Sequence, residues 1–144
     1  MISMSGRTFL DTNVLVYAYD RTDPAKQATA SGLIERHLRA DTGCISVQVL
    51  GEFYVTVTRK IPRPLALSAA AAAVAAFGPL RTVELSRAMV RQAVTLHQRG
   101  ELSYWDALIV VAAERAGCET ILSEDLQPGR SYQSVRVVDP FAPA

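Results

Sequence analysis

The sequence predicts an α/β fold in which a parallel sheet is covered by helices on both faces. Short apolar segments typical of buried strands alternate with longer segments of helical periodicity, and Gly or Pro marks many of the junctions between them. A length of 144 residues with 49% hydrophobic residues fits one domain over residues 1–144 with a substantial core. We therefore expect a single three-layer α/β/α domain.

Five apolar segments are predicted to be the strands. They are Arg7–Leu10, Cys44–Ser46, Leu80–Leu85, Cys118–Ser123 and Val135–Val138. Two of them open with a cysteine, and at such positions a small buried core thiol is favoured over a disulfide or a metal ligand.

The segments between these strands are predicted to be helices. Asp23 before Pro24 is typical of a helix N-terminus, and Ser86 and Ser103 can cap two later helices. The helix after Pro24 carries an apolar stripe at helical spacing that consists of Ala30, Leu33, Ile34, His37 and Leu38. On that stripe, His37 is interpreted as a helix residue and not as a ligand. The remaining helices are expected over 13–19, 47–59, 65–77, 86–99 and 103–116.

Four acidic residues adjoin apolar segments instead of charged surface stretches: Asp11, Glu52, Asp106 and Asp125. Asp11 ends the first predicted strand and Asp125 follows the fourth. Ligands of open parallel sheets bind beyond the carboxyl ends of the strands. Acids are seldom buried unless something pairs with them, and a divalent cation is one such partner.

Each acid also has an ordinary structural interpretation. Asp11 can be a plain N-cap, and Asp106 stands three residues after Ser103, as in a capping box. Glu52 can be an exposed residue of an amphipathic helix and Asp125 a turn residue. Taken singly these interpretations are favoured, but together they do not predict four acids that share positions at or near strand ends.

The charge balance and the termini exclude some classes of function. A formal net charge of +1 provides no global attraction to nucleic acid, so any such binding must rest on a local patch. Met1–Gly6 lacks the regions of a signal peptide, and the longest apolar stretch, 65–77, is too short to cross a bilayer. We expect a cytoplasmic protein without a membrane anchor.

Four segments of the chain resemble the acidic motifs of PIN-domain ribonucleases, in order and spacing. They are Leu10-Asp11-Thr12-Asn13-Val14-Leu15, Glu52 after Ser46–Leu50, Ser103–Ile109 around Asp106, and Leu122-Ser123-Glu124-Asp125-Leu126. The resemblance covers nearly the whole chain, and at this length it is most similar to the VapC toxins of toxin–antitoxin pairs.

The resemblance implies a five-stranded parallel sheet with the first and fourth strands as neighbours, and a metal-dependent endoribonuclease. Carboxylate sites favour hard cations, so Mg²⁺ or Mn²⁺ is expected. Asp11 and Asp106 are expected as direct ligands, while Glu52 and Asp125 hold a second metal or orient its waters. Asn13 and Ser123 are candidates for hydrogen bonds to the ligands, with capping as the alternative.

Expectations for partners are an RNA substrate, a VapB-like antitoxin that inserts an Arg-bearing segment, and a homodimer. Arg59, Lys60 and Arg63 are candidate RNA contacts, although a solvated surface is the default for such residues. For Trp105, core packing is favoured over stacking on a base.

Two other functions remain as alternatives. A phosphatase of the haloacid dehalogenase type also opens on a strand-end Asp, but it needs a second Asp where Asn13 stands. A PIN-like scaffold or binding module without catalysis would have no use for mutually repelling carboxylates.

Overall fold

Six strands form one sheet in the computed structural model, which describes residues 6–143. The strands are β1 (Thr8–Leu10), β2 (Gly43–Ser46), β3 (Arg81–Val83), β4 (Thr120–Leu122), β5 (Ser131–Tyr132) and β6 (Val135–Val138). Their order across the sheet is β3-β2-β1-β4-β6-β5. All neighbours are parallel except β5 and β6, which form an antiparallel pair.

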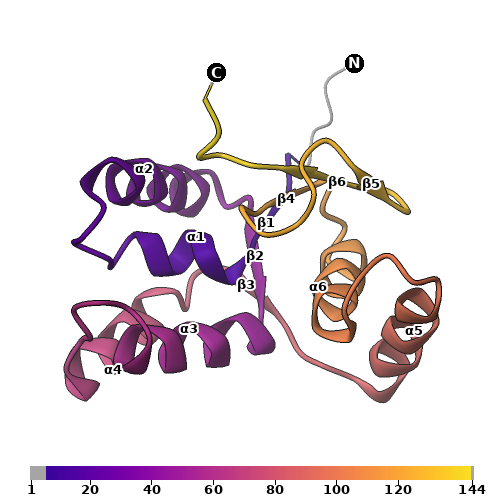
Figure 1. The fold of residues 1–144 in the computed structure, drawn as a ribbon, viewed down its shortest axis with the longest axis horizontal. Coiled ribbons are helices and arrows are strands. Elements are labelled where there is room, and N and C mark those ends of the chain that lie inside the picture. Colours follow the sequence, from indigo (N-terminus) through magenta and orange to yellow (C-terminus); the bar gives the residue numbers. More distant parts are fainter. Residues whose placement is uncertain (1–5, 144) are drawn as a thin grey trace.

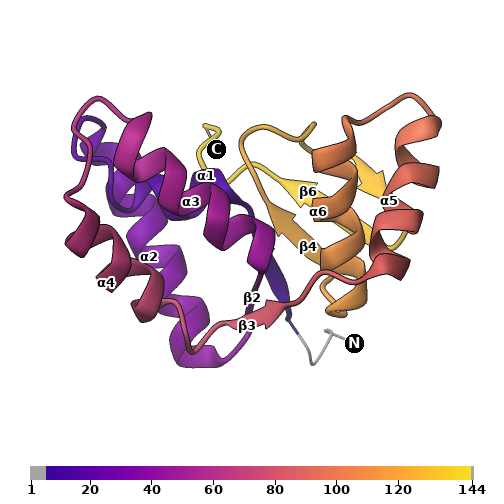
Figure 2. The same ribbon diagram turned by 90° about the horizontal axis from the view of Figure 1, so that it is seen from below.

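Six helices cover the two faces of this sheet. They are α1 (Thr12–Tyr17), α2 (Pro24–Ala40), α3 (Val47–Arg59), α4 (Leu67–Ala76), α5 (Arg87–Gln98) and α6 (Tyr104–Arg115). Figures 1 and 2 show α1 to α4 on one side of the sheet and α5 with α6 on the other. The predicted three-layer α/β arrangement is therefore confirmed.

The register of the central strands places the carboxyl ends of β1, β4 and β6 side by side. Leu10 of β1 pairs with Leu122 of β4, and Leu122 pairs with Val138 of β6. The backbone N–H of Asp11 donates to the carbonyl oxygen of Leu122 at 3.0 Å, so the segments that follow β1 and β4 stay in contact. The predicted neighbourhood of the first and fourth strands is confirmed.

Helix starts follow the predicted caps. The side chains of Asp23, Ser86 and Ser103 each accept a hydrogen bond from a backbone N–H in the first turn of α2, α5 and α6. Residues 47–59 form α3 despite their β-branched side chains, and Val49, Phe53 and Val57 bury one face of it. The core is continuous between the sheet and both helix layers.

The main difference from the prediction is the sixth strand. β5 has only two residues and is exposed on one of them, so it carries no apolar run that marks a strand in the sequence. Gln133 adopts φ 58° between β5 and β6 and allows the tight reversal. All five predicted strands appear, and the third and fourth are shorter than predicted, at 81–83 and 120–122.

Some expectations concern termini and single residues. Cys44 and Cys118 are free and buried, as predicted. His37 is also buried, and its Nδ1 lies 2.7 Å from Thr42 Oγ1. Residues 1–5, which carry most of the expectation that no signal peptide is present, lie outside the described residues. Over 6–143, no helix combines the length and apolarity of a membrane span.

Candidate functional site

Asp11 lies at the centre of the candidate site, directly after β1. Its side chain is only 6% exposed. One carboxylate oxygen, Oδ1, accepts the backbone N–H of Thr12 at 2.7 Å and so caps α1. The other oxygen, Oδ2, accepts the hydroxyl of Ser123 at 2.7 Å. The N-cap interpretation of Asp11 is therefore correct, and the same carboxylate also faces the segment that follows β4.

Ser123 and Asn13 connect Asp11 to Asp125. The Asn13 side-chain amide donates to Asp125 Oδ2 at 3.2 Å and lies 3.5 Å from Asp11 Oδ2. The fully buried hydroxyl of Ser123 accepts the backbone N–H of Asp125 at 3.1 Å. Both residues that were predicted to bond the acids thus lie between two of them.

Glu52 and Asp106 approach the same region from α3 and α6. Thr12 donates its hydroxyl to Glu52 Oε1 at 2.8 Å, and Gln48 donates its side-chain amide to Glu52 Oε2 at 3.2 Å. Asp106 lies in the first turn of α6, where its backbone N–H donates to Ser103 Oγ at 3.1 Å. Ser103 therefore caps α6 at the point where the helix presents the acid.

The electrostatics of these side chains indicate that they share one site. Burial raises the pKa of Asp11 to about 6, although hydrogen bonds from Ser123 and Thr12 lower it, and the charges of Asp125 and Asp106 raise it further. The pKa of Asp106 is raised mainly by burial, with further contributions from the charges of Asp125 and Glu52. Each of the four predicted acids is thus within electrostatic reach of another.

A cavity of about 660 Å³ opens beside the acids, between α1 and α3. Glu52 and Asp125 line it together with Asn13 at one end, and Lys60 and Pro62 also belong to its lining. Of the three residues predicted to contact RNA, Lys60 alone lines this cavity, whereas Arg59 and Arg63 are exposed nearby on the same chain segment.

The donor set fits a hard divalent cation. The hydrogen bonds to the carboxylates of Asp11, Glu52 and Asp125 come from neutral groups, namely backbone N–H, hydroxyls and amides. Carboxylate oxygens are the ligands that Mg²⁺ and Mn²⁺ prefer. Within 6–143, no three acidic, His or Cys side chains are close enough to form a ready-made cage. Mg²⁺ is commonly bound through one or two carboxylates, with waters and substrate phosphate as the other ligands, so an open site suits it.

Trp105 lies beside this site and is exposed. Its side chain is 59% exposed, so the prediction that it packs in the core is wrong. Trp105 lies in the first turn of α6 beside Asp106, at a position of the helix that faces the surface. There the indole packs edge-on against Tyr104, with ring centroids 4.9 Å apart. The backbone carbonyl of Trp105 accepts the amide of Gln48 at 3.3 Å.

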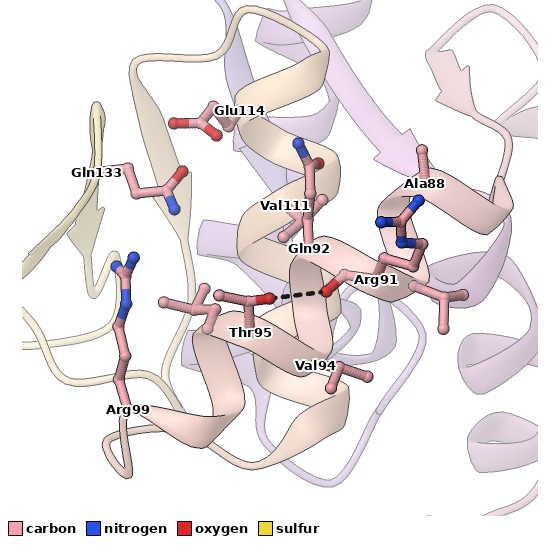
Figure 3. Close-up of a pocket in the computed structure, with 11 residues that line it drawn as sticks. Ala88, Arg91, Gln92, Val94, Thr95, Arg99, Val111, Glu114 and Gln133 are labelled. Atoms are coloured by element: carbon pink, nitrogen blue, oxygen red, sulfur yellow. Dashed lines mark hydrogen bonds between the residues drawn. The ribbon is translucent and has the colours of Figure 1, made fainter.

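A second cavity of similar volume lies on the other side of the sheet, between α5 and α6 (Figure 3). Its lining includes Arg91 of α5, Arg99 directly after that helix, Glu114 of α6, and Gln133 of the turn between β5 and β6. None of the four predicted acids is among its lining residues. Because it lies away from the carboxyl ends of the central strands, it is not the candidate site.

Three further residues at the site were missed in the sequence. Thr12 binds Glu52, and the Tyr17 hydroxyl donates to Glu124, the neighbour of Asp125, at 2.6 Å. Gln48 had a recognisable signal, because it stands four residues before Glu52 on one helix and so shares a face with it. Thr12 and Tyr17 had none, because their contacts lie 40 and 107 residues away in the sequence.

Comparison with protein families gives a match to the PIN domain over residues 8–130. The matched residues include all four acids. The match gives no support to the haloacid dehalogenase alternative. No match is found among curated proteins.

Solved structures with the same fold include three toxins or toxin complexes. VapC20 of Mycobacterium tuberculosis, described as a sarcin-ricin loop cleaving toxin, is 23% identical with a TM-score of 0.62, covering 82% of this chain and 89% of its own. A toxin–antitoxin complex from Klebsiella pneumoniae is 18% identical with a TM-score of 0.68, covering 93% and 98%. VapBC2 of Rickettsia felis, bound to promoter DNA, is 19% identical with a TM-score of 0.58, covering 82% and 87%.

Proposed function

The chain belongs to the PIN domain family, and we propose that it is a metal-dependent endoribonuclease that acts as the toxin of a toxin–antitoxin pair. The observation that carries the nuclease proposal is the electrostatic proximity of four carboxylates beyond the carboxyl ends of the strands, three of which accept hydrogen bonds from neutral donors. A scaffold gains nothing from such a cluster, because like charges repel one another. The solved structures of similar fold support the toxin part of the proposal.

In this proposal Asp11 and Asp106 hold Mg²⁺ or Mn²⁺ directly. A divalent cation, when bound, lowers the pKa of a coordinated water and stabilises the charge of the phosphate during attack. Glu52 and Asp125 hold a second cation or orient ligand waters. Ser123 and Asn13 fix the direction of the Asp11 and Asp125 carboxylates through the hydrogen bonds described above.

Substrate contacts are proposed on both sides of the acids. Lys60 lines the cavity that Glu52 and Asp125 share, where its ammonium can pair with a phosphate next to the one that is cleaved. Arg59 and Arg63 extend this basic segment. Trp105, exposed next to Asp106, offers a face on which an unpaired base can stack.

A cleavage assay with purified protein tests the nuclease proposal. We expect cleavage of a labelled RNA with unpaired loops in Mg²⁺ or Mn²⁺ and none in excess chelator, since carboxylates alone do not generate hydroxide at neutral pH. The Asp11→Asn protein, purified in parallel, controls for a contaminating nuclease. Full cleavage in chelator by a metal-free preparation would refute the mechanism, and a comparison with DNA defines the substrate class.

A growth assay tests the toxin proposal separately. Expression of the chain alone in its host should arrest growth, and Asp11→Asn should abolish the arrest. Co-expression of a small protein from an adjacent reading frame should relieve it through a stable complex, in which an Arg-bearing segment pairs with the carboxylates. Size-exclusion chromatography with light scattering then tests the proposed homodimer. If the active nuclease is harmless to its host, the toxin assignment fails while the nuclease one stands.

A further inference from the structure

A polar cluster lies next to the acids, and two of its members, Tyr17 and Glu124, line the same cavity as Glu52 and Asp125. The cluster consists of Lys26 of α2, Tyr17 of α1 and Glu124, which lies two residues after the end of β4. The Tyr17 hydroxyl donates to Glu124 Oε1 at 2.6 Å, and the Lys26 ammonium donates to Glu124 Oε2 and, at 3.2 Å, to the Tyr17 hydroxyl. Both oxygens of the Glu124 carboxylate are therefore engaged, by two elements far away in sequence.

Phe141 of the C-terminal segment covers this cluster. Its ring packs edge-on against Tyr17 with centroids 4.9 Å apart, and the Lys26 ammonium lies 5.7 Å from its centroid and 4.7 Å from that of Tyr17. The side chains of Lys26 and Glu124 are 32% and 26% exposed. An ion pair that is partly shielded and bound at several atoms keeps its geometry better than a fully exposed pair.

The cluster holds the loop that carries Asp125. Glu124 precedes Asp125, and its backbone N–H donates to Asn13 Oδ1 at 3.1 Å, so it is bound through both its main chain and its side chain. Asp125 is exposed, and its carboxylate accepts a hydrogen bond from the amide of Asn13. The direction of the Asp125 carboxylate therefore depends on the backbone of a short loop, which Glu124 anchors to α1 and α2.

We propose that Lys26, Tyr17 and Glu124 form a positioning clamp that holds Asp125 in the geometry needed to bind a divalent cation. The inference rests on the proposed function, because it assigns the clamp a role toward the cation that the acids would hold. None of the three touches the reacting atoms; they act through Asp125. If the loop is released, the Asp125 carboxylate samples several orientations. Binding of the cation must then order the loop, which lowers the affinity for the cation.

Binding of Mn²⁺ to the intact, RNA-free protein tests this clamp directly. Lys26→Met keeps much of the aliphatic stem and removes the charge, so we expect the Mn²⁺ dissociation constant, measured by calorimetry, to rise about tenfold or more. Glu124→Gln should act in the same direction, and Lys26→Arg should recover much of the affinity. In cleavage assays, the Mn²⁺ concentration for half-maximal activity should rise in parallel, while activity at saturating Mn²⁺ should recover.

A matched control is available on the same helix. Arg39 and Glu35 form an exposed ion pair on α2, with side chains 74% and 66% exposed, so Arg39→Met removes a charge from α2 without touching the loop. It should leave Mn²⁺ affinity unchanged. If Lys26→Met does not fold, Tyr17→Phe removes one hydroxyl and keeps the ring packing, with a smaller rise expected.

The outcomes separate the clamp from the proposed function. If the wild-type protein binds Mn²⁺ and cleaves RNA but Lys26→Met, or Tyr17→Phe in its place, keeps the same Mn²⁺ affinity, the cluster is only a structural brace and the inference is wrong. A wild-type protein that binds no divalent cation overturns the metal assignment itself, and the role of the clamp with it.

Discussion

Asp11 combines two roles that its sequence context presented as alternatives. Its Oδ1 caps α1, and its Oδ2 is held by Ser123 within a site that other acids share. The cap fixes the carboxylate at the carboxyl end of β1, and burial makes its charged form costly. A structural role of an acid is therefore no argument against a catalytic one.

Substitution of Asp11 or Asp106 by Asn tests these roles residue by residue. Asn keeps the size of the side chain but removes a ligand charge, so we expect RNA cleavage to fall about 100-fold or more. The fold should survive, because Asn can still cap α1. Circular dichroism and a cleavage assay give both readouts. Near-normal cleavage by Asp106→Asn would mean that Asp106 serves α6 alone.

Trp105 offers a direct optical readout, because it is the only tryptophan of the chain. In chelator, where no cleavage occurs, binding of a short unpaired RNA should quench its fluorescence by stacking. Trp105→Ala should weaken binding by about 1–3 kcal/mol, and Trp105→Phe by less. Quenching by a protein partner but not by RNA would identify the indole as a protein contact instead.

At the scale of elements, the sequence predicted what depends on local signals. Helix caps could be predicted at Asp23, Ser86 and Ser103, because the backbone N–H groups that they bind lie three residues away. β5 could not be predicted, since a two-residue antiparallel strand depends on pairing with β6 and not on its own composition. The exposure of Trp105 was misjudged for the same reason, because it depends on how α6 lies against the sheet.

Ser103 and Ser86 form a matched pair of caps that tests how α6 positions its acid. Each accepts a first-turn N–H, at 3.1 Å and 3.2 Å. Substitution of either by Ala should lower the free energy of unfolding by about 1 kcal/mol. Ser103→Ala should also reduce cleavage, because the Ser103 hydroxyl accepts the backbone N–H of Asp106 and so helps to position that residue. Ser86→Ala should leave cleavage unchanged. Equal loss of activity in both variants would attribute the effect to stability alone.

At the scale of the whole molecule, the candidate site depends on topology. The adjacency of β1 and β4 brings together residues that are 112 positions apart, such as Asp11 and Ser123. The motifs in the sequence predicted which residues meet, but the contacts of Lys26, Tyr17 and Glu124 required the structure. The cluster of acids costs the metal-free protein stability, as functional sites often do.

This cost predicts how stability depends on pH in the absence of metal. The pKa of Asp11 rises from 3.8 to about 6 on folding, so the folded state binds the proton more tightly than the unfolded state. The contribution to stability is fully present below pH 4 and is lost as the pH rises through 6. Two pKa units correspond to roughly 3 kcal/mol, an upper bound for this one group.

Urea unfolding in chelator at pH 5 and pH 7.5 measures the effect, with Asp11→Asn as the reference. The wild-type protein should lose more stability than Asp11→Asn between the two pH values, because Asn does not titrate. Addition of Mg²⁺ at pH 7.5 should restore stability to the wild-type protein. Above the dissociation constant, the gain should grow with the logarithm of the Mg²⁺ concentration, and it should be much smaller for Asp11→Asn. If both proteins show the same pH dependence, folding does not raise the pKa of Asp11, and the repulsion among the acids does not lower the stability of the metal-free protein through this residue.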